Sequence, residues 1–255
     1  MRADPKIVVM GTESESSYAV CNYLNSRFKG CVFVSEQPET RSVFVRRRIK
    51  KLGILRVAGQ IAFQSLAVPL LKLASGQRLR EIRTEFELDA VPVAGFEIPS
   101  VHSPDAIALL DRLQPTIIVL AGTRILGAEF LEHVRCPIVN IHAGITPQYR
   151  GVHGGYWALV EKRPELCGVT VHLVDAGIDT GRVLKQAVIH PSARDNFATY
   201  PWIQMGVGLK LLAELLPDLM AGRVSCAEPS AEESRLRTHP TIWEYCRHRV
   251  FGGVK

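Results

Sequence analysis

Short apolar runs alternate with helix-forming segments along this chain, and this alternation constrains its fold more than any other feature. Residues 6–11 and 31–35 are strand-like apolar runs, and residues 14–28 between them carry the spacing of a helix. The same order returns later, as a helix at 104–113, a strand at 116–120, a helix at 127–134 and a strand at 137–141. Because strands that alternate with helices pair in parallel, the sequence predicts an α/β fold with a doubly wound, mostly parallel sheet.

The remaining segments extend the same layers. They are an expected helix at 154–161, strands at 169–174 and 183–189, and a long helix at 197–219. A chain of 255 residues is long enough for one large domain. We therefore expect a main domain over residues 1–222 and a short C-terminal extension over residues 223–255. The cytoplasm is the expected location, because the first residues lead straight into a strand and not into a long apolar segment with a cleavage site.

A basic helical insertion is expected within the main domain at about residues 37–88. Residues 41–83 hold much of the excess charge of a chain with net charge +6, and Glu81 is their one acid. Residues 52–73 are mostly apolar, but Arg56 and several polar residues interrupt them, so they are a poor candidate for a membrane-spanning helix. Such an insertion fits three roles: peripheral contact with an anionic membrane surface, a helical cap, and a homodimer face.

Three polar residues in the second half of the chain are suited to acyl transfer. Asn140 and His142 stand two residues apart at the end of an apolar run, so their side chains point to one face of the expected strand. An amide and an imidazole can both hydrogen-bond the oxyanion that forms when an amine attacks a formyl or acyl carbon. Asp179, in a glycine-containing loop, is the natural carboxylate for the proton of the amine. Asp175 in the same loop either acts with it or stabilises the turn.

Other kinds of site find little support. The six cysteines have no C-x-x-C spacing, and the histidines have no H-x-x-x-H or H-E-x-x-H spacing, so we expect no metal and no disulfide framework. The turn after the first strand, with Gly11 and Thr12, lacks G-x-G-x-x-G, which argues against a nicotinamide cofactor. Amides at a helix N-terminus there could still receive a phosphate. Since an aromatic and basic platform for RNA is also missing, no nucleic-acid partner is expected.

A cluster that follows the Asn-x-His pair offers groups for a substrate. Tyr149 and His153 have faces that could stack on a sugar or a base, and Arg150 could pair with a phosphate. The alternative interpretation of these residues is loop structure and helix packing. With the turn after the first strand, the candidate substrate-binding residues are Gly11, Thr12, Tyr149, Arg150 and His153.

Three blocks of residues resemble a known family in their order and nearly in their spacing. They are Val119-Leu120-Ala121-Gly122-Thr123-Arg124-Ile125-Leu126, then Asn140-Ile141-His142 with Pro147 and Tyr149-Arg150-Gly151, then Gly168-Val169-Thr170-Val171-His172 leading to Asp175 and Asp179. From about residue 6 to residue 189 the chain resembles the folate-dependent formyltransferases, which include glycinamide ribonucleotide, methionyl-tRNA and sugar N-formyltransferases. The resemblance implies a Rossmann-like formyltransferase fold.

The resemblance also implies the chemistry. Asn140, His142 and Asp179 would be the catalytic residues, and 10-formyltetrahydrofolate would be the formyl donor. Protonated His142 and Asn140 would hold the oxyanion, while Asp179 orients His142 and relays the proton. The residues that would bind the folate are Leu120, Thr123, Arg124, Ile125, Leu126, Val174, Ala176, Gly177 and Ile178.

Two features of the family that are missing from this sequence reduce the number of expected formyl acceptors. The glycine-rich loop of glycinamide ribonucleotide enzymes is absent after the first strand, and the C-terminal β-barrel of the tRNA-modifying relatives does not follow residue 219. We therefore expect a small-molecule amine, and first of all a nucleotide-linked amino sugar used in cell-surface polysaccharide synthesis. The alternatives are a glycinamide ribonucleotide acceptor and hydrolysis of 10-formyltetrahydrofolate by water.

Overall fold

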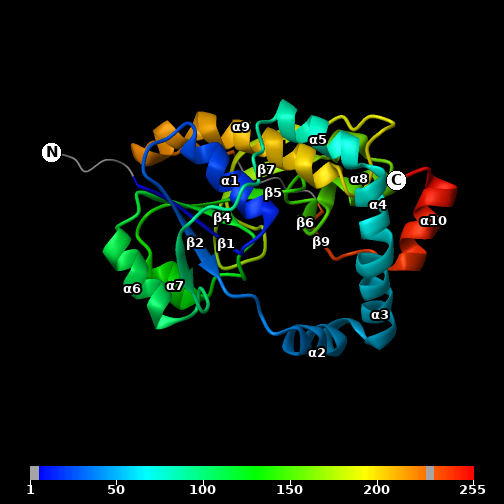
Figure 1. Ribbon diagram of the computed structural model, residues 1–255, viewed down its shortest axis with the longest axis horizontal. Helices are drawn as coiled ribbons and strands as arrows, with labels where there is room; N and C mark the ends of the chain where they lie inside the picture. Colours follow the sequence, from blue (N-terminus) through cyan, green and yellow to red (C-terminus); the bar gives the residue numbers. More distant parts are fainter. Residues whose placement is uncertain (1–5, 228–232) are drawn as a thin grey trace.

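The computed structural model of the chain describes residues 6–227 and 233–255 and has a layered α/β architecture (Figure 1). In this part of the chain, seven strands form one sheet in the order β3-β2-β1-β4-β5-β7-β8. The first five in sequence pair in parallel, whereas β7 is antiparallel to both β5 and β8. The strands are β1 (Ile7–Gly11), β2 (Cys31–Glu36), β3 (Phe96–Ile98), β4 (Ile117–Ala121), β5 (Ile138–His142), β7 (Gly168–Leu173) and β8 (Val183–Val188). The predicted doubly wound, mostly parallel sheet is confirmed.

Helices cover both faces of the sheet, which is why β1 is buried along its whole length. Ile7 and Val9 belong to one apolar core, and Val8 and Met10 belong to the other. The first core is covered by α1 (Glu15–Asn25) and α9 (Tyr200–Met220). The second is covered by α6 (Pro104–Leu113) and α7 (Ala128–His133).

A glycine and a helix cap set the turn from β1 into α1. A Cβ atom at Gly11 would lie 2.5 Å from the carbonyl oxygen of Ala121 on β4, so no larger residue fits without a shift of the backbone. Ser14 caps α1 because its side chain accepts a hydrogen bond from the backbone N–H of Ser17. The start of α1 therefore lies against the end of β4, at the point where the strand order reverses about β1.

The basic segment consists of helices joined by short turns. They are α2 (Arg41–Leu52), the continuous helix Ile54–Ala74, and α5 (Gly76–Glu85). The continuous helix comprises α3 (Ile54–Ala62), a π-helical turn (Phe63–Ala67) and α4 (Val68–Ala74). By length and composition it is apolar enough to cross a membrane, with a mean hydropathy of 1.5. One side of it is buried through Val57, Gln60 and Phe63.

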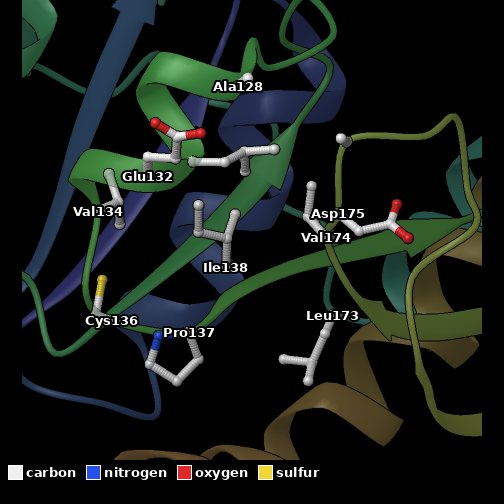
Figure 2. Close-up of a pocket in the computed structure, with 11 residues that line it drawn as sticks. Ala128, Glu132, Val134, Cys136, Pro137, Ile138, Leu173, Val174 and Asp175 are labelled. Atoms are coloured by element: carbon white, nitrogen blue, oxygen red, sulfur yellow. The ribbon is translucent and has the colours of Figure 1, made fainter.

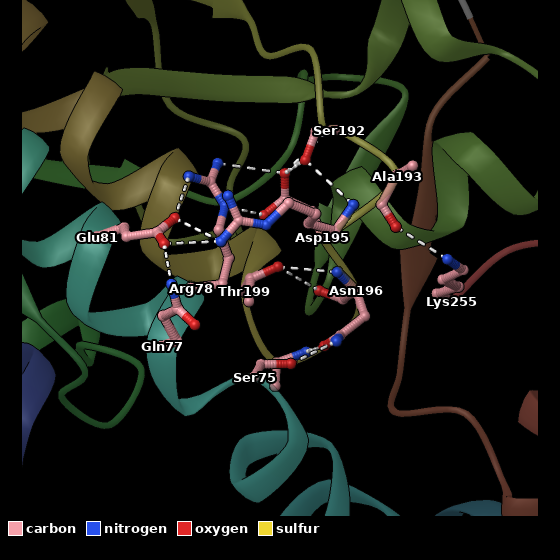
Figure 3. Close-up of polar contacts among 12 residues, drawn as sticks. Ser75, Gln77, Arg78, Glu81, Ser192, Ala193, Asp195, Asn196, Thr199 and Lys255 are labelled. Atoms are coloured by element: carbon pink, nitrogen blue, oxygen red, sulfur yellow. Dashed lines mark hydrogen bonds and ion pairs between the residues drawn. The ribbon is translucent and has the colours of Figure 1, made fainter.

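A polar network fixes α5 to the loop before α9 (Figure 3). Arg78 Nε donates to Asp195 Oδ1 at 2.8 Å, and Asn196 Nδ2 donates to Ser75 Oγ at 2.6 Å. Asp195 is 1% exposed, and it also accepts hydrogen bonds from Ser192. Because the buried carboxylate is both paired and hydrogen-bonded, its loss of hydration is compensated. The network therefore anchors one end of the insertion, while none of the residues of α2 at the other end is buried.

Residues 233–255 pack against the main domain. β9 (Arg235–Arg237) pairs in parallel with β6 (Tyr149–Gly151), and α10 (Ile242–Gly252) packs against α3. The division into a main domain and a C-terminal extension at residue 222 stays a prediction. The strands β3, β6 and β9 were not predicted, because three residues are too few to show an alternating pattern.

Phe63 and Leu66 belong to the same π-helical turn, yet Phe63 is 0% exposed and Leu66 is 61% exposed. Phe63→Ala should lower the free energy of unfolding by about 3–5 kcal/mol, because it empties a core site beside Phe197 and Tyr245. Leu66→Ala is the matched control and should change it by about 0.5 kcal/mol or less. Urea unfolding followed by circular dichroism measures both, and equal effects would show that the insertion is not anchored through Phe63.

Candidate active site

A cavity of about 780 Å³ lies beyond the carboxyl ends of β4 and β5. Its walls come from the loops after β4 and β7, from the end of β5, and from β9. In open α/β sheets the crevice at the reversal of strand order is the usual place for a ligand. The position of the cavity therefore makes it the candidate active site.

Asn140, His142 and Asp179 meet in this cavity. Asp179 Oδ2 lies 3.3 Å from His142 Nδ1, and Asp179 Oδ1 lies 3.5 Å from Asn140 Nδ2. His142 is buried, and the side chain of Asp179 is 12% exposed. The structure thus brings together the amide, the imidazole and the carboxylate that the sequence singled out.

Two further groups lie beside the Asp179 carboxylate. The backbone N–H of Gly151 donates to Oδ2 at 2.8 Å, and His172 Nε2 lies 3.7 Å from Oδ1. His172 Nδ1 donates to the carbonyl of Leu173 at 2.8 Å, which fixes the orientation of the ring. Because β5 and β7 pair with Asn140 opposite His172, the amide Nδ2 and the ring Nε2 are 3.1 Å apart. Because its Nδ1 hydrogen is used on Leu173, His172 Nε2 is placed to accept a hydrogen bond from Asn140 Nδ2.

Burial and neighbouring charges set the protonation of the site. Burial lowers the pKa of His142, although the charge of Asp179 and the carbonyl of Tyr149 act in the opposite direction. Burial alone would raise the pKa of Asp179, but the His172 hydrogen bond, the charge of His142 and the Gly151 amide outweigh it and lower this pKa. Burial disfavours the charge on His142 on which the lowered pKa of Asp179 partly depends, so the expectation that His142 is protonated stays a prediction. His142 Nε2 donates to the Tyr149 carbonyl at 2.6 Å, and Nδ1 faces Asp179.

Most residues predicted to bind the formyl donor line the cavity. They are Leu120, Thr123, Arg124, Ile125, Leu126, Val174, Gly177 and Ile178. Ala176 instead lines a smaller pocket of about 430 Å³ between α7 and the loop after β7, where Figure 2 shows Glu132 and Ile138 near Val174. Eight of the nine residues thus lie together at the candidate site and Ala176 does not, and their role in folate binding stays a prediction.

Arg124 and Asp175 have structural partners within this wall. Arg124 forms an ion pair with buried Glu36 at 3.1 Å and donates to the carbonyl of Gln37 at 2.6 Å. Asp175 Oδ1 accepts hydrogen bonds from the N–H of Gly177 at 3.0 Å and from the hydroxyl of Thr180 at 2.7 Å. Of the two roles left open for Asp175, the structure shows the stabilisation of the turn.

The candidate substrate-binding residues are only partly brought to the cavity. His153 lines it, whereas Gly11 and Thr12 do not belong to its walls. Tyr149 is 1% exposed and its hydroxyl donates to Glu161 at 2.7 Å, so the prediction that its ring contacts a substrate is wrong. Arg150 also lies outside the walls, where it donates to the carbonyl of Ile178 and to Ser234.

Sequence reasoning missed the far end of the cavity, which holds Arg48 on α2, Pro201 on α9, and Leu236, Arg237, Thr238 and His239 around β9. His153 Nε2 and Gln64 Nε2 lie 3.0 Å and 2.9 Å from His239 Nδ1. Burial, with the neighbouring His239, lowers the pKa of His153 to about 3, and burial, with Arg48, lowers the pKa of His239 to about 4. Both rings are therefore neutral groups that can accept or donate hydrogen bonds.

No cluster of three or more His, Cys, Asp or Glu side chains within residues 6–227 and 233–255 is arranged to hold a metal ion. The six cysteines are unpaired, and burial raises the pKa of Cys21 and Cys136 to about 11. These thiols therefore stay protonated near neutral pH and add no nucleophile to the site.

Comparison with known proteins agrees with this geometry. The formyl transferase family model matches residues 68–200. Methionyl-tRNA formyltransferase from Anaeromyxobacter dehalogenans is 32% identical over 177 residues, which cover 69% of this chain and 56% of the relative. The match thus spans about half of the length of the curated relatives, from 40% to 60%.

Solved structures with this fold have low sequence identity to the chain. A sugar N-formyltransferase from a Shewanella species has a TM-score of 0.56 at 17% identity, over 91% of this chain and 76% of that one. Glycinamide ribonucleotide transformylase 1 from Symbiobacterium toebii has a TM-score of 0.57 at 16% identity, over 93% and 96% of the two chains. At such identities the likeness shows a common fold.

The two neutral histidines predict how stability depends on pH. Below pH 6.5 both rings become protonated in the unfolded chain. In the folded chain His153 and His239 are protonated only near their pKa values of about 3 and about 4, so the free energy of unfolding falls as the pH falls. His239→Gln keeps an acceptor for Gln64 and should flatten this dependence between pH 6.5 and 5 by up to about 1.4 kcal/mol per pH unit.

Denaturant unfolding at a series of pH values measures this dependence. Between pH 7.5 and 8.5, where both states hold the ring neutral, the two proteins should show the same slope. If the slopes also match between pH 6.5 and 5, His239 is not kept neutral by the fold.

Proposed function

Since the chain belongs to the formyl transferase family, we propose that it transfers a formyl group from 10-formyltetrahydrofolate to a primary amine. The observation that carries this proposal is the Asp179 carboxylate, which lies within 3.5 Å of both Asn140 and His142 at one cavity wall. General acid–base chemistry needs a titratable group within reach of the reacting proton, and oxyanion stabilisation needs fixed donors beside it. The three side chains supply both.

The mechanism follows from the hydrogen bonds of the free site. When the neutral amine attacks the formyl carbon, its nitrogen gains positive charge and the formyl oxygen becomes an oxyanion. Asn140 Nδ2 has two hydrogens, one directed at His172 and one at Asp179 Oδ1 over 3.5 Å, and the longer contact is the one that would give way so that Nδ2 donates to this oxyanion. Asp179 accepts the proton from the attacking nitrogen and returns it to the leaving folate nitrogen, so no proton is gained or lost overall. His142 Nδ1, 3.3 Å from the carboxylate, stabilises the proton in transit.

The cavity is suited to a flat, partly polar donor. Leu120, Ile125, Leu126 and Val174 give its lining apolar surface, and Gly177 and Ile178 also line it. The Glu36 ion pair holds Arg124 and with it the loop after β4. These residues would hold the pterin ring of the folate, which supplies the activated formyl group when bound.

For the acceptor, we propose a nucleotide-linked amino sugar. The far end of the cavity offers neutral hydrogen-bonding groups from His153 and His239, which suit sugar hydroxyls, and the cation Arg48, which suits a phosphate. A sugar N-formyltransferase shares the fold. A second candidate is methionyl-tRNA, because a curated relative at 32% identity acts, by its name, on that substrate.

Substitutions in the trio test the reaction. Asn140→Ala should lower kcat by about 100 to 1000-fold through loss of an oxyanion donor. Asp179→Asn should lower kcat by a similar factor, because it keeps the shape of the side chain and removes the carboxylate base. Asp175→Asn is the matched control, because an amide oxygen still accepts from the Gly177 N–H, and it should stay within about tenfold of the wild type. Tetrahydrofolate release measures the rates, and a wild-type rate for Asp179→Asn would refute the mechanism.

An acceptor panel identifies the amine. The purified protein is incubated with 10-formyltetrahydrofolate and with nucleotide-linked amino sugars, glycinamide ribonucleotide or methionyl-tRNA, and each acceptor is analysed by mass. We expect one added formyl group on an amino sugar. Formylation of methionyl-tRNA or glycinamide ribonucleotide alone would replace the sugar proposal, and tetrahydrofolate release without any acceptor would identify a hydrolase.

A further inference from the structure

The outward side of the continuous helix Ile54–Ala74 is apolar and lacks a covering element. Large side chains along it are exposed, among them Leu55 at 78%, Leu70 at 67% and Leu73 at 81%. Only 22% of its most apolar stretch is buried. Exposed apolar surface of this extent on one helix marks an interaction site.

The polar residues that interrupt this helix in the sequence do not interrupt its outer face. Gln60 is buried and donates to the carbonyl of His239 at 2.6 Å, and Gln64 Nε2 lies 2.9 Å from His239 Nδ1. The polar groups that point toward solvent are chiefly Arg56, Ser65 and Lys72. The tertiary structure has therefore sorted the helix into an inner side with the glutamines and an outer side that is nearly continuous apolar surface.

Positive charge surrounds this outer side. Residues 41–80 contain no acid at all. On α2, which packs against α3, the exposed side chains of Arg46, Lys50 and Lys51 form no ion pair with any residue in the described ranges, and the same holds for Lys72 on α4. An apolar helix flanked by unpaired cations has the composition of a segment that lies in a membrane interface.

We propose that α2 and the outer side of the helix Ile54–Ala74 bind the surface of an anionic lipid bilayer. The apolar side chains would enter the boundary between headgroups and acyl chains, and the arginines and lysines would meet the lipid phosphates. Val250 and Phe251 at the end of α10, which packs against α3, are also exposed, at 73% and 86%.

The helix lies on the membrane and does not cross it. Its inner side is part of the core, because the ring of Phe63 is 0% exposed and packs at 4.8 Å from Phe197 and at 4.9 Å from Tyr245. A spanning helix would have to give up these contacts and the hydrogen bonds of Gln60. Binding along the outer side leaves all of them in place.

Charge favours a bilayer over a second copy of the chain. A symmetric dimer places the same patch of both copies face to face. Although Glu39 and Glu244 pair with Arg47 and Arg56, the unpaired cations of both copies would then meet, and juxtaposed like charges are costly in an interface. An anionic lipid surface supplies the missing negative charge.

Vesicle flotation tests the proposal without reference to the enzymatic reaction. The full chain is mixed with vesicles of phosphatidylcholine, either alone or with phosphatidylglycerol. We expect flotation with the anionic vesicles and weaker flotation at high salt, where the Debye length shrinks to about 3 Å at 1 M. Lys50→Glu with Lys51→Glu should lower the partition coefficient by at least about tenfold, because each basic side chain near the surface contributes. Leu70→Gln with Leu73→Gln should lower it similarly.

Matched controls reverse charge or remove an exposed apolar side chain outside the insertion. Arg112→Glu with Arg135→Glu makes an equal charge change near α6 and α7, at the opposite end of the molecule in Figure 1, and Val91→Gln changes an apolar residue that is 60% exposed. Both controls should float like the wild type, and circular dichroism should show that every variant is folded.

Three results would overturn the proposal. One is no flotation of the wild type with anionic vesicles, and another is equal flotation of the controls and the insertion variants. The third is that the wild type does not bind vesicles but forms a dimer in solution, and that Leu70→Gln with Leu73→Gln dissociates this dimer. The last result would assign the surface to a second copy.

Discussion

The antiparallel pairing of β5 with β7 is the interaction on which the candidate site depends. It sets Asn140 opposite His172 and His142 opposite Thr170. A slip of one residue would turn these side chains to the other face of the sheet. The hydroxyl of Thr170 donates to the carbonyl of Gly144 at 2.7 Å and so holds the loop that follows His142. The end of β7 then leads into the turn that returns Asp179 to the same place.

A partly buried carboxylate can stay ionised only when donors replace its lost water. The Gly151 amide donates to Asp179 at 2.8 Å, and Asn140 Nδ2 donates to it at 3.5 Å. Gly151 belongs to β6, which pairs with β9, so the C-terminal part of the chain helps to position the group that would move the proton. Fold and chemistry are thus coupled through one backbone amide.

The insertion has two sides with different surroundings. Its inner side contributes to the site, because Arg48 lines the cavity and donates to Gln60 at 2.7 Å, while Gln60 and Gln64 contact His239. Its outer side presents apolar and basic groups to solvent. A bilayer bound on the outer side would therefore lie one helix away from the cavity. This arrangement links the proposed membrane surface to the proposed acceptor end.

By itself the sequence determined the layered sheet and its long helices, because these depend on local periodicity. It also singled out Asn140, His142 and Asp179, because these depend on a spacing of two residues along a strand and on contiguous blocks that resemble the family. Tertiary structure decided what depends on distant partners. It buried Tyr149 against Glu161, turned Gln60 and Gln64 inward, and paired β6 with β9 across 86 residues of sequence. Burial also lowers the pKa of His142. Desolvation and long-range pairing come from packing between distant segments, and no local pattern records them.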